Sequence, residues 1–156
     1  MLERDASHIV MKAVLWNGRT LTRRVELLPD RAGFKVTSEL TGKGRLVMRV
    51  HPSFNIGPSK STALFLYHGD KKAEISLSGQ EKLDSYFSEA DCPTGKWGFV
   101  TKVAGKDVTV LNTFDADQID FCYVNMRQEE KRLNLEQWSK PQNDRTVITN
   151  TYEFVK

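Results

Sequence analysis

Turn-forming clusters interrupt this chain at short and nearly regular distances. Groups of Gly, Pro, Asn and Asp recur from 17–19 (NGR) to 140–144 (KPQND), with roughly ten residues between them, a spacing typical of all-β proteins. The segments between the clusters are rich in Val, Leu, Thr, Phe and Tyr, which favour strands. Examples are 97–103 (WGFVTKV), 107–114 (DVTVLNTF) and 146–155 (TVITNTYEFV). Many short strands joined by turns predict an antiparallel β-sandwich or barrel.

Two segments also carry helical signals. In 78–90 (SGQEKLDSYFSEA), Ser78 and Glu81 have the spacing of a capping box, and Leu83 and Phe87 are one helical turn apart. We therefore predict one short helix there. Residues 118–138 could also be drawn as a helix, but their apolar part (FCYV) consists of strand formers. For this region we predict two strands joined by a charged turn (RQEEK).

Length and composition favour one compact domain over residues 1–156, since a chain of this size can bury a core. The formal net charge is +3, and the basic residues are scattered among acidic ones, so we expect no nucleic-acid partner. No segment approaches the roughly 18–20 apolar residues of a membrane helix, and the first residues lack the apolar core of a signal peptide. These features predict a soluble cytoplasmic protein with no membrane partner.

Metal and cofactor signals are weak. Cys92 and Cys122 lack the nearby Cys or His companions that a zinc site needs, so we expect two reduced thiols. The glycines of 41–44 (TGKG) lack the spacing of a phosphate-binding loop, and no acidic triad suggests calcium. We expect no metal and no cofactor.

Alternation along the predicted strands separates an apolar face from a polar one, because successive strand residues point to opposite sides. A polar face with aromatic rings suits sugars, whose hydroxyls need donors and acceptors while their C–H groups pack on rings. The plain alternative is that these residues are packing residues, solvated charges and a His-Pro turn. The polar and aromatic sets are Arg49 with His51, Asn134 with Glu136 and Trp138, and Phe121 with Tyr123 and Asn125.

The segment 49–57 (RVHPSFNIG) resembles a strand and loop of the galactose mutarotase-like (aldose 1-epimerase) superfamily, where a histidine precedes Pro or Ser and then an aromatic-Asn pair. The resemblance covers about Leu21 to Val155, and corresponds to the C-terminal half of a usual member. Other segments resemble the family in the same order: 21–40 its preceding hairpin, 95–100 (GKWGFV) and 108–115 (VTVLNTFD) later core strands, 132–141 (RLNLEQWSKP) the strand of the catalytic glutamate, and 146–155 the final strand.

The resemblance implies a fold, a chemistry and a set of site residues. The fold would be half of a galactose mutarotase-like supersandwich. At the matching positions, His51 would act as general acid on the sugar ring oxygen, and Glu136 as general base on the anomeric hydroxyl. Opening a hemiacetal requires both proton transfers, from groups on opposite sides of one ring in an open cleft. The other expected sugar-binding residues are Arg49, Asn55, Tyr123, Asn134 and Trp138.

The chain lacks several of the residues that family members use to bind and convert the sugar, and this decides the function that we expect. Family members also supply an Arg and a further His from their N-terminal half, and an Asp that holds the sugar; His8 does not match these positions. We therefore expect a carbohydrate-binding protein without the full catalytic machinery. The alternatives are a noncatalytic structural or protein-interaction sandwich, and an active mutarotase that uses His51 and Glu136. Exposed strand edges of a half-length sandwich favour a homodimer.

Overall fold

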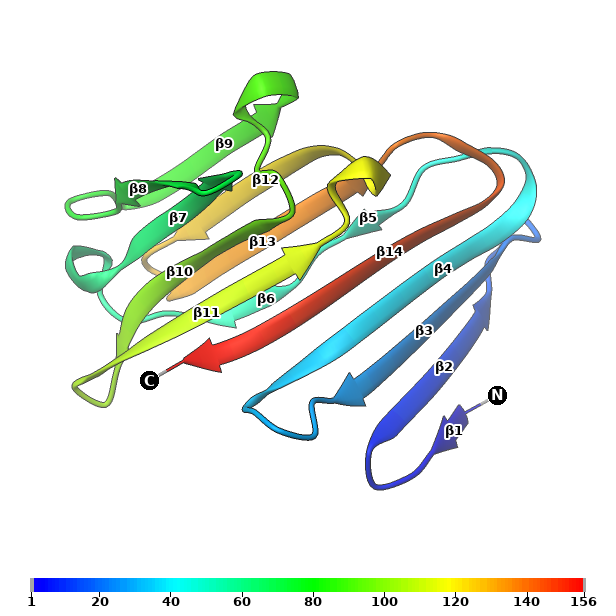
Figure 1. The fold of residues 1–156 in the computed structure, drawn as a ribbon, viewed down its shortest axis with the longest axis horizontal. Helices are drawn as coiled ribbons and strands as arrows, with labels where there is room; N and C mark the ends of the chain where they lie inside the picture. Colours follow the sequence, from blue (N-terminus) through cyan, green and yellow to red (C-terminus); the bar gives the residue numbers. More distant parts are fainter. Residues whose placement is uncertain (1, 156) are drawn as a thin grey trace.

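A computed structural model describes residues 2–155, which form two antiparallel sheets (Figure 1). The nine-stranded sheet has the order β1 (Leu2–Arg4), β2 (His8–Val14), β3 (Thr20–Leu27), β4 (Gly33–Leu46), β14 (Gln142–Val155), β11 (Lys106–Phe114), β10 (Lys96–Val103), β7 (Ala63–His68) and β8 (Lys71–Ser76). The five-stranded sheet consists of β5 (Arg49–Val50), β13 (Arg132–Ser139), β12 (Ile119–Arg127) and β9 (Lys82–Ser88) in that order, with β6 (Ser53–Asn55) also paired to β13. The antiparallel all-β sandwich expected from the sequence is confirmed.

The helix expected within 78–90 is wrong. Residues 82–88 form β9, which pairs with β12 over its whole length, and only Glu89–Asp91 make a single 3-10 turn. Leu83 and Phe87, taken as one helical stripe, lie on the core side of this strand. Burying both against the second sheet outweighs the local helical signals, because tertiary packing overrides propensity. The 118–138 region forms the two strands β12 and β13, as expected.

A buried polar network joins the two sheets within the core. Asn112 of β11 accepts hydrogen bonds from Trp97 Nε1 at 2.7 Å and from Gln137 Nε2 of β13 at 3.3 Å. The Asn112 amide donates in turn to Asn150 Oδ1 at 2.9 Å. All four side chains are at most 2% exposed. Because buried polar groups are costly without partners, this network favours one register between the sheets.

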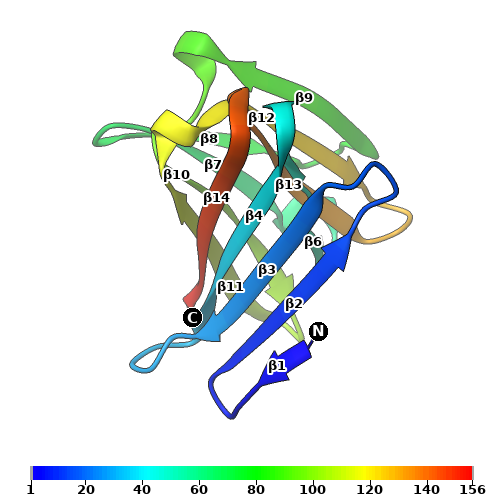
Figure 2. The same cartoon turned by 90° about the vertical axis from the view of Figure 1, so that its right-hand side faces the viewer.

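The nine-stranded sheet extends beyond its partner. In Figure 1, β2 and β3 lie at the opposite side of the molecule from β9 and β12, and Figure 2, in which that side faces the viewer, shows β2 and β3 in the foreground. Ile9 and Met11 of β2 lie opposite Val25 and Arg23, on the side of the sheet that β14 turns toward the core. Both are nevertheless 41% exposed. This part of the inner face is therefore only partly covered.

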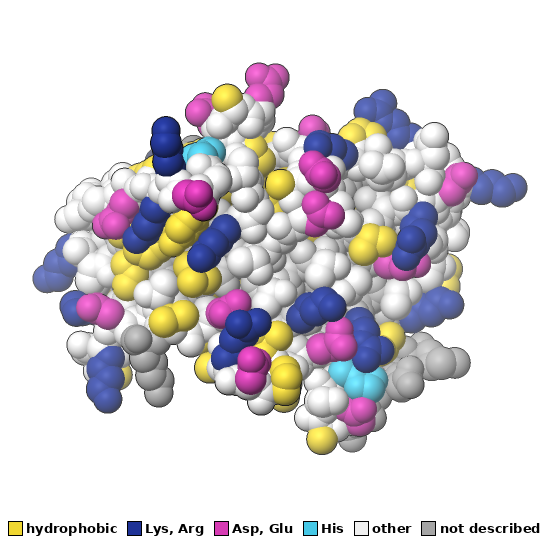
Figure 3. Space-filling model, viewed as in Figure 1, with side chains coloured by type: hydrophobic (Ala, Val, Ile, Leu, Met, Phe, Trp, Pro, Cys, Tyr) yellow, Lys and Arg dark blue, Asp and Glu magenta, His cyan; other side chains and the backbone are white. Residues whose placement is uncertain are grey.

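The opposite, outer face of the nine-stranded sheet carries both signs of charge. Figure 3 shows Lys and Arg interspersed with Asp and Glu across this view, with small apolar patches between them. Some of these patches pack under a cation, as where Lys72 Nζ lies 3.5 Å from the ring centre of Phe65. No helix in the described range 2–155 is long and apolar enough to cross a bilayer.

The two cysteines, distant in sequence, are neighbours in space. Cys92 follows β9 and Cys122 lies on β12, with their Sγ atoms 3.9 Å apart, and both are free thiols. Burial raises the pKa of Cys122, which is fully buried. The hydrogen bond with Cys122 lowers the pKa of half-buried Cys92 to about 7. Sequence spacing gave no sign of this proximity, since it depends on the turn after β9.

Candidate functional site

The outer face of the five-stranded sheet carries rows of polar and aromatic side chains. The register places Trp138 opposite Phe121 and Arg49, and Glu136 opposite Tyr123. Residues opposite one another on paired strands point to the same side, so these side chains share one face. The alternate residues of β13 point into the core: Leu133, Leu135 and Gln137.

Glu136 is the centre of a closed polar cluster on this face. Glu136 is only 1% exposed, so water cannot solvate its carboxylate freely. Each carboxylate oxygen instead has a side-chain partner: Arg49 Nε donates to Oε2 at 2.7 Å, and His51 Nε2 lies 3.1 Å from Oε1. Arg49 Nη2 also lies 3.2 Å from His51 Nδ1. Arginine can only donate, so we assign Nδ1 as acceptor and place the ring proton on Nε2, which donates to Glu136. Both Glu136 oxygens and both His51 ring nitrogens therefore have a partner within the cluster.

Arg49 links this buried carboxylate to the aromatic surface. Burying a carboxylate is unfavourable unless its charge is balanced, and the Arg49 guanidinium provides that balance. The same guanidinium lies 5.5 Å from the ring centre of Trp138, a cation–π arrangement. The Arg49 side chain is 43% exposed, whereas that of Glu136 is 2% exposed. Arg49 is therefore the accessible member of the pair.

Four aromatic side chains, which we call the aromatic row, continue from Arg49 across the sheet: Trp138, Phe121, Tyr86 and Tyr123. Trp138 stacks on Phe121 with ring centres 5.2 Å apart, and Tyr86 stacks on Tyr123 at 4.4 Å. Tyr86 also lies 5.9 Å from Phe121, so the row is continuous. Tyr86 is 69% exposed. The row presents ring surface to solvent next to charged and amide groups.

A second carboxylate, Asp84 of β9, anchors the far end of the row. It accepts hydrogen bonds from the Tyr123 hydroxyl at 2.5 Å and from Asn125 Nδ2 at 2.6 Å, and it forms an ion pair with Arg127 at 2.9 Å. The Tyr123 hydrogen bond, followed by those of Arg127 and Asn125, lowers the pKa of Asp84. The Asp84 carboxylate in turn raises the pKa of Tyr123.

The structure brings most of the sequence-predicted residues together. Arg49, His51, Glu136 and Trp138 form one group, and Tyr123 joins it through the aromatic row.

Asn134 and Asn55 lie farther along the same face. Asn134 is 2% exposed and bonds Asn125 at 3.4 Å, while its Oδ1 has no partner within residues 2–155. Asn55 lies opposite Arg132, four positions along β13 from Glu136, and lines a separate cavity of about 320 Å³. The loop after Asn55 reaches Gly57, where only glycine fits because a Cβ would collide with the Lys102 carbonyl oxygen. The amide of Asn55 is thus remote from the Glu136 cluster.

Sequence reasoning missed Asp84 and Tyr86, because both fall in the segment assigned to a helix. The signal was present as a period-two pattern: Leu83, Ser85 and Phe87 alternate with the outward-facing residues of 82–88. Reading that alternation as a strand would have placed Asp84 and Tyr86 on one face. It would not have identified β12 as the neighbouring strand.

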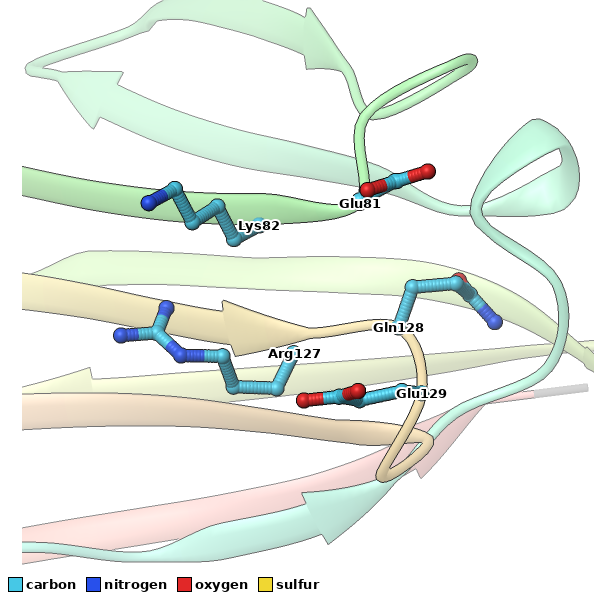
Figure 4. Close-up of a pocket in the computed structure, with 5 residues that line it drawn as sticks. All are labelled: Glu81, Lys82, Arg127, Gln128 and Glu129. Carbon is cyan, nitrogen blue, oxygen red and sulfur yellow. The ribbon is translucent and has the colours of Figure 1, made fainter.

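A cavity of about 540 Å³ lies at the opposite end of this sheet from Trp138, between the start of β9 and the β12–β13 turn (Figure 4). Lys82 and Arg127 extend side by side along their strands, and Glu129 reaches back toward the Arg127 side. Glu81 and Gln128 complete the lining. Both signs of charge meet here, so the cavity shows no clear preference for one charge of ligand.

Comparison with protein-family models and with curated proteins gives no match to the sequence. Solved structures do match. YeaD, a mutarotase candidate from Salmonella typhimurium, has a TM-score of 0.67 at 11% identity, covering 100% of this chain and 63% of YeaD. The Slr1438 protein from Synechocystis sp. PCC 6803 has a TM-score of 0.66 at 10% identity, covering 99% of this chain and 64% of Slr1438. A galactose mutarotase-like protein from Lactobacillus casei ATCC 334 has a TM-score of 0.65 at 9% identity, covering 99% and 72%.

This chain has the galactose mutarotase-like fold. The resemblance drawn from the sequence motifs is confirmed at the level of the fold. At these low identities the likeness concerns the fold alone, and the chain spans less than two thirds of YeaD and of Slr1438.

Within this galactose mutarotase-like fold, the residues expected to act as acid and base touch each other. His51 Nε2 lies 3.1 Å from the Glu136 carboxylate, so no sugar ring fits between the two groups. An acid and a base that open a pyranose must approach the ring oxygen and the anomeric hydroxyl separately. In this structure the two groups lie in contact with each other, not on opposite sides of an open cleft.

Proposed function

We propose that this chain is a carbohydrate-binding protein that uses the outer face of its five-stranded sheet, and that it does not catalyse mutarotation. The observation that carries the proposal is the aromatic row, which lies between two fixed polar clusters, one at Glu136 and one at Asp84. The match to mutarotase-like folds supports it in general terms.

The chemistry of this face suits a sugar. The exposed ring of Tyr86 and the half-buried ring of Trp138 offer flat surfaces for the C–H side of a pyranose. The Arg49 guanidinium donates from one end of the row, and the Asp84 carboxylate accepts at the other. Both groups are already oriented by their neighbours, so little side-chain freedom is lost on binding.

The closed cluster supports binding without catalysis. Both Glu136 oxygens already accept hydrogen bonds, and the His51 proton is donated to Glu136 rather than outward. Freeing the base would require breaking a buried ion pair, which is costly because the carboxylate would be left unsolvated. We infer that Glu136 positions Arg49 and His51 at the surface.

A titration with matched tryptophan variants tests the binding proposal. Glucose, galactose and a short glucan are titrated while amide shifts are followed by two-dimensional NMR. Trp138→Ala should weaken binding roughly tenfold, the effect of losing about 1.4 kcal/mol of ring contact. Trp16→Ala is the control, because Trp16 is 98% exposed in the β2–β3 turn, away from this face. Equal affinity in both variants, or no shifts at any sugar concentration, would count against the proposal.

Polarimetry separates binding from catalysis. The spontaneous mutarotation of α-D-glucose should proceed at the same rate with and without the protein, and Glu136→Gln should make no difference. Acceleration by the wild-type protein that disappears in a folded Glu136→Gln variant would favour the mutarotase alternative, in which His51 is the acid and Glu136 the base.

The protein-interaction alternative and the homodimer remain predictions. The five-stranded sheet ends at β5 and β9, and unpaired strand edges favour association with another chain. A light-scattering mass of one chain across a wide concentration range would exclude a homodimer. Absence of sugar binding together with a stable dimer would favour the interaction module.

A further inference from the structure

A second recess borders the proposed carbohydrate face and shares one residue with it, His51. It is a groove of about 280 Å³ between the segment Val50–Pro52 and the inner face of β2, β3, β4 and β14. The lining comes from both sheets, at the place where the five-stranded sheet ends with β5 and the larger sheet continues through β4, β3 and β2. The groove therefore combines sheet surface with a rim formed by chain from the second layer.

Arg23 gives this groove an unbalanced positive charge. Its Nε donates to Ser38 Oγ at 3.1 Å, and Ser38 is 1% exposed. Among the side chains that the structure describes, those of residues 5–155, no acidic one forms an ion pair with Arg23. Its neighbour Arg24 points to the opposite face and pairs with Glu26 at 3.2 Å. An arginine on an apolar inner face without a carboxylate partner retains donors for an anion.

Two buried polar side chains from β14 line the same groove. Tyr152 is 3% exposed, and we find no hydrogen bond from its hydroxyl to the described part of the chain. Burial raises the pKa of Tyr152, and the nearby Arg23 charge opposes that rise, which places the guanidinium near the phenol. Asn150 accepts from Asn112 through its Oδ1, so its amide nitrogen remains a donor. Arg23, Tyr152 and Asn150 thus supply donors to one small volume.

The remaining lining is apolar apart from His51, whose ring also contacts Glu136. Met11, Val25, Phe34 and Val36 come from three neighbouring strands, and Pro52 closes the rim. Apolar walls with a few convergent polar groups are typical of small-molecule sites, and a volume near 300 Å³ suits a small ligand. The arginine fork binds carboxylates and phosphates alike, but its single positive charge balances a monoanionic carboxylate and only half the charge of a dianionic phosphate.

We propose that this groove binds a small carboxylate with an apolar tail. The carboxylate pairs with the Arg23 guanidinium and accepts from Tyr152 and Asn150, while the tail packs along Val25, Val36 and Met11. The occupant compensates the charge that no residue of the described chain balances. The site borders the sugar-binding face and shares His51 with it, but its donors Arg23 and Tyr152 belong to the nine-stranded sheet.

NMR titration with hexanoate tests the charge requirement. Amides around Arg23, Ser38 and Asn150 should shift with saturation at millimolar hexanoate, while hexanamide, of the same size but neutral, should bind about tenfold more weakly or not at all. Inorganic phosphate should produce no saturable shift. Equal binding of hexanoate and hexanamide would overturn the proposal, since apolar contact alone would then explain occupancy.

Adjacent arginines provide the matched control. Arg23→Gln should weaken hexanoate binding about tenfold, whereas Arg24→Gln, on the other face of the same strand, should leave it unchanged. Circular dichroism checks that both variants fold, and Tyr152→Phe, which removes only the hydroxyl, should weaken binding less. Equal effects of the two arginine substitutions would overturn the proposal. It would also be overturned if the groove amides shifted on dilution alone, because a second copy of the chain would then be the occupant.

Discussion

Two carboxylates on one sheet face, Glu136 and Asp84, have similar hydrogen-bond partners but differ in burial. Glu136 is bound by Arg49 and a ring nitrogen of His51, and Asp84 by Arg127 and a phenol. The Glu136 side chain is 2% exposed and that of Asp84 is 40% exposed. Water can replace a lost partner at Asp84 but not at Glu136. The partners of Glu136 should therefore stabilise the fold, whereas those of Asp84 should mainly orient side chains at the surface.

Arg49→Ala should have the largest effect, because it leaves Glu136 buried without its balancing charge. We expect a loss of roughly 3 kcal/mol in the free energy of unfolding, the low end for a broken buried pair because Arg49 itself is 43% exposed. Urea denaturation at neutral pH measures this. Combining it with Glu136→Gln should recover much of the loss, since the buried charge is then gone. A loss below about 1 kcal/mol would show that water reaches Glu136, as at an exposed pair.

Replacing each carboxylate by its amide sharpens the comparison. Asp84→Asn should cost at most about 1 kcal/mol, because its ion pair is exposed and screened. Glu136→Gln should cost about 1–3 kcal/mol, since a buried group loses hydrogen bonds to charged partners. Both are measured by urea denaturation in the same buffer. If the two losses are equal, or their order is reversed, burial does not distinguish the two sites.

Strand alternation placed the residues of the Glu136 half on one face, and the family resemblance added their expected roles. The expected strand over 132–139 coincides with β13, and alternation placed Asn134, Glu136 and Trp138 on its polar side. The short strand β5 was also indicated, which brought Arg49 into the site. Strand β13 could be recognised because its sequence alternates apolar Leu133 and Leu135 with polar Asn134 and Glu136, although the structure buries both sides.

The Asp84 half could not be predicted in the same way. Residues 78–90 contain competing local signals, and only pairing with β12 decides that 82–88 is a strand. The 3.1 Å contact between His51 and Glu136 also depends on how β5 is placed against β13, which no local pattern specifies. Contacts between strands distant in sequence are set by core packing, and that part of the site became visible only in three dimensions.

The smallest expected effect is a pH dependence confined to the Asp84 end. The hydrogen bond from Tyr123, then those from Arg127 and Asn125, lower the pKa of Asp84 below its ordinary value of 3.8. A carboxyl whose pKa is lower in the folded state adds stability that is fully present above its unfolded pKa and is lost as pH falls through the folded pKa. The stability difference between wild type and Asp84→Asn should thus be constant above about pH 5 and shrink below about pH 4.

Carboxyl NMR of Asp84 measures the same effect directly and does not require unfolding. Its titration midpoint should lie below 3.8, and the Arg127→Gln variant should move it upward by less than Tyr123→Phe, because the Tyr123 hydrogen bond is the largest cause of the shift. Conversely, Asp84 raises the pKa of the Tyr123 phenol, so this phenol should titrate at lower pH in the Asp84→Asn variant. Phenolate absorbance measures that titration. A midpoint at or above 3.8 would mean that these bonds do not hold in solution, and the aromatic row would then be anchored at the Glu136 end only.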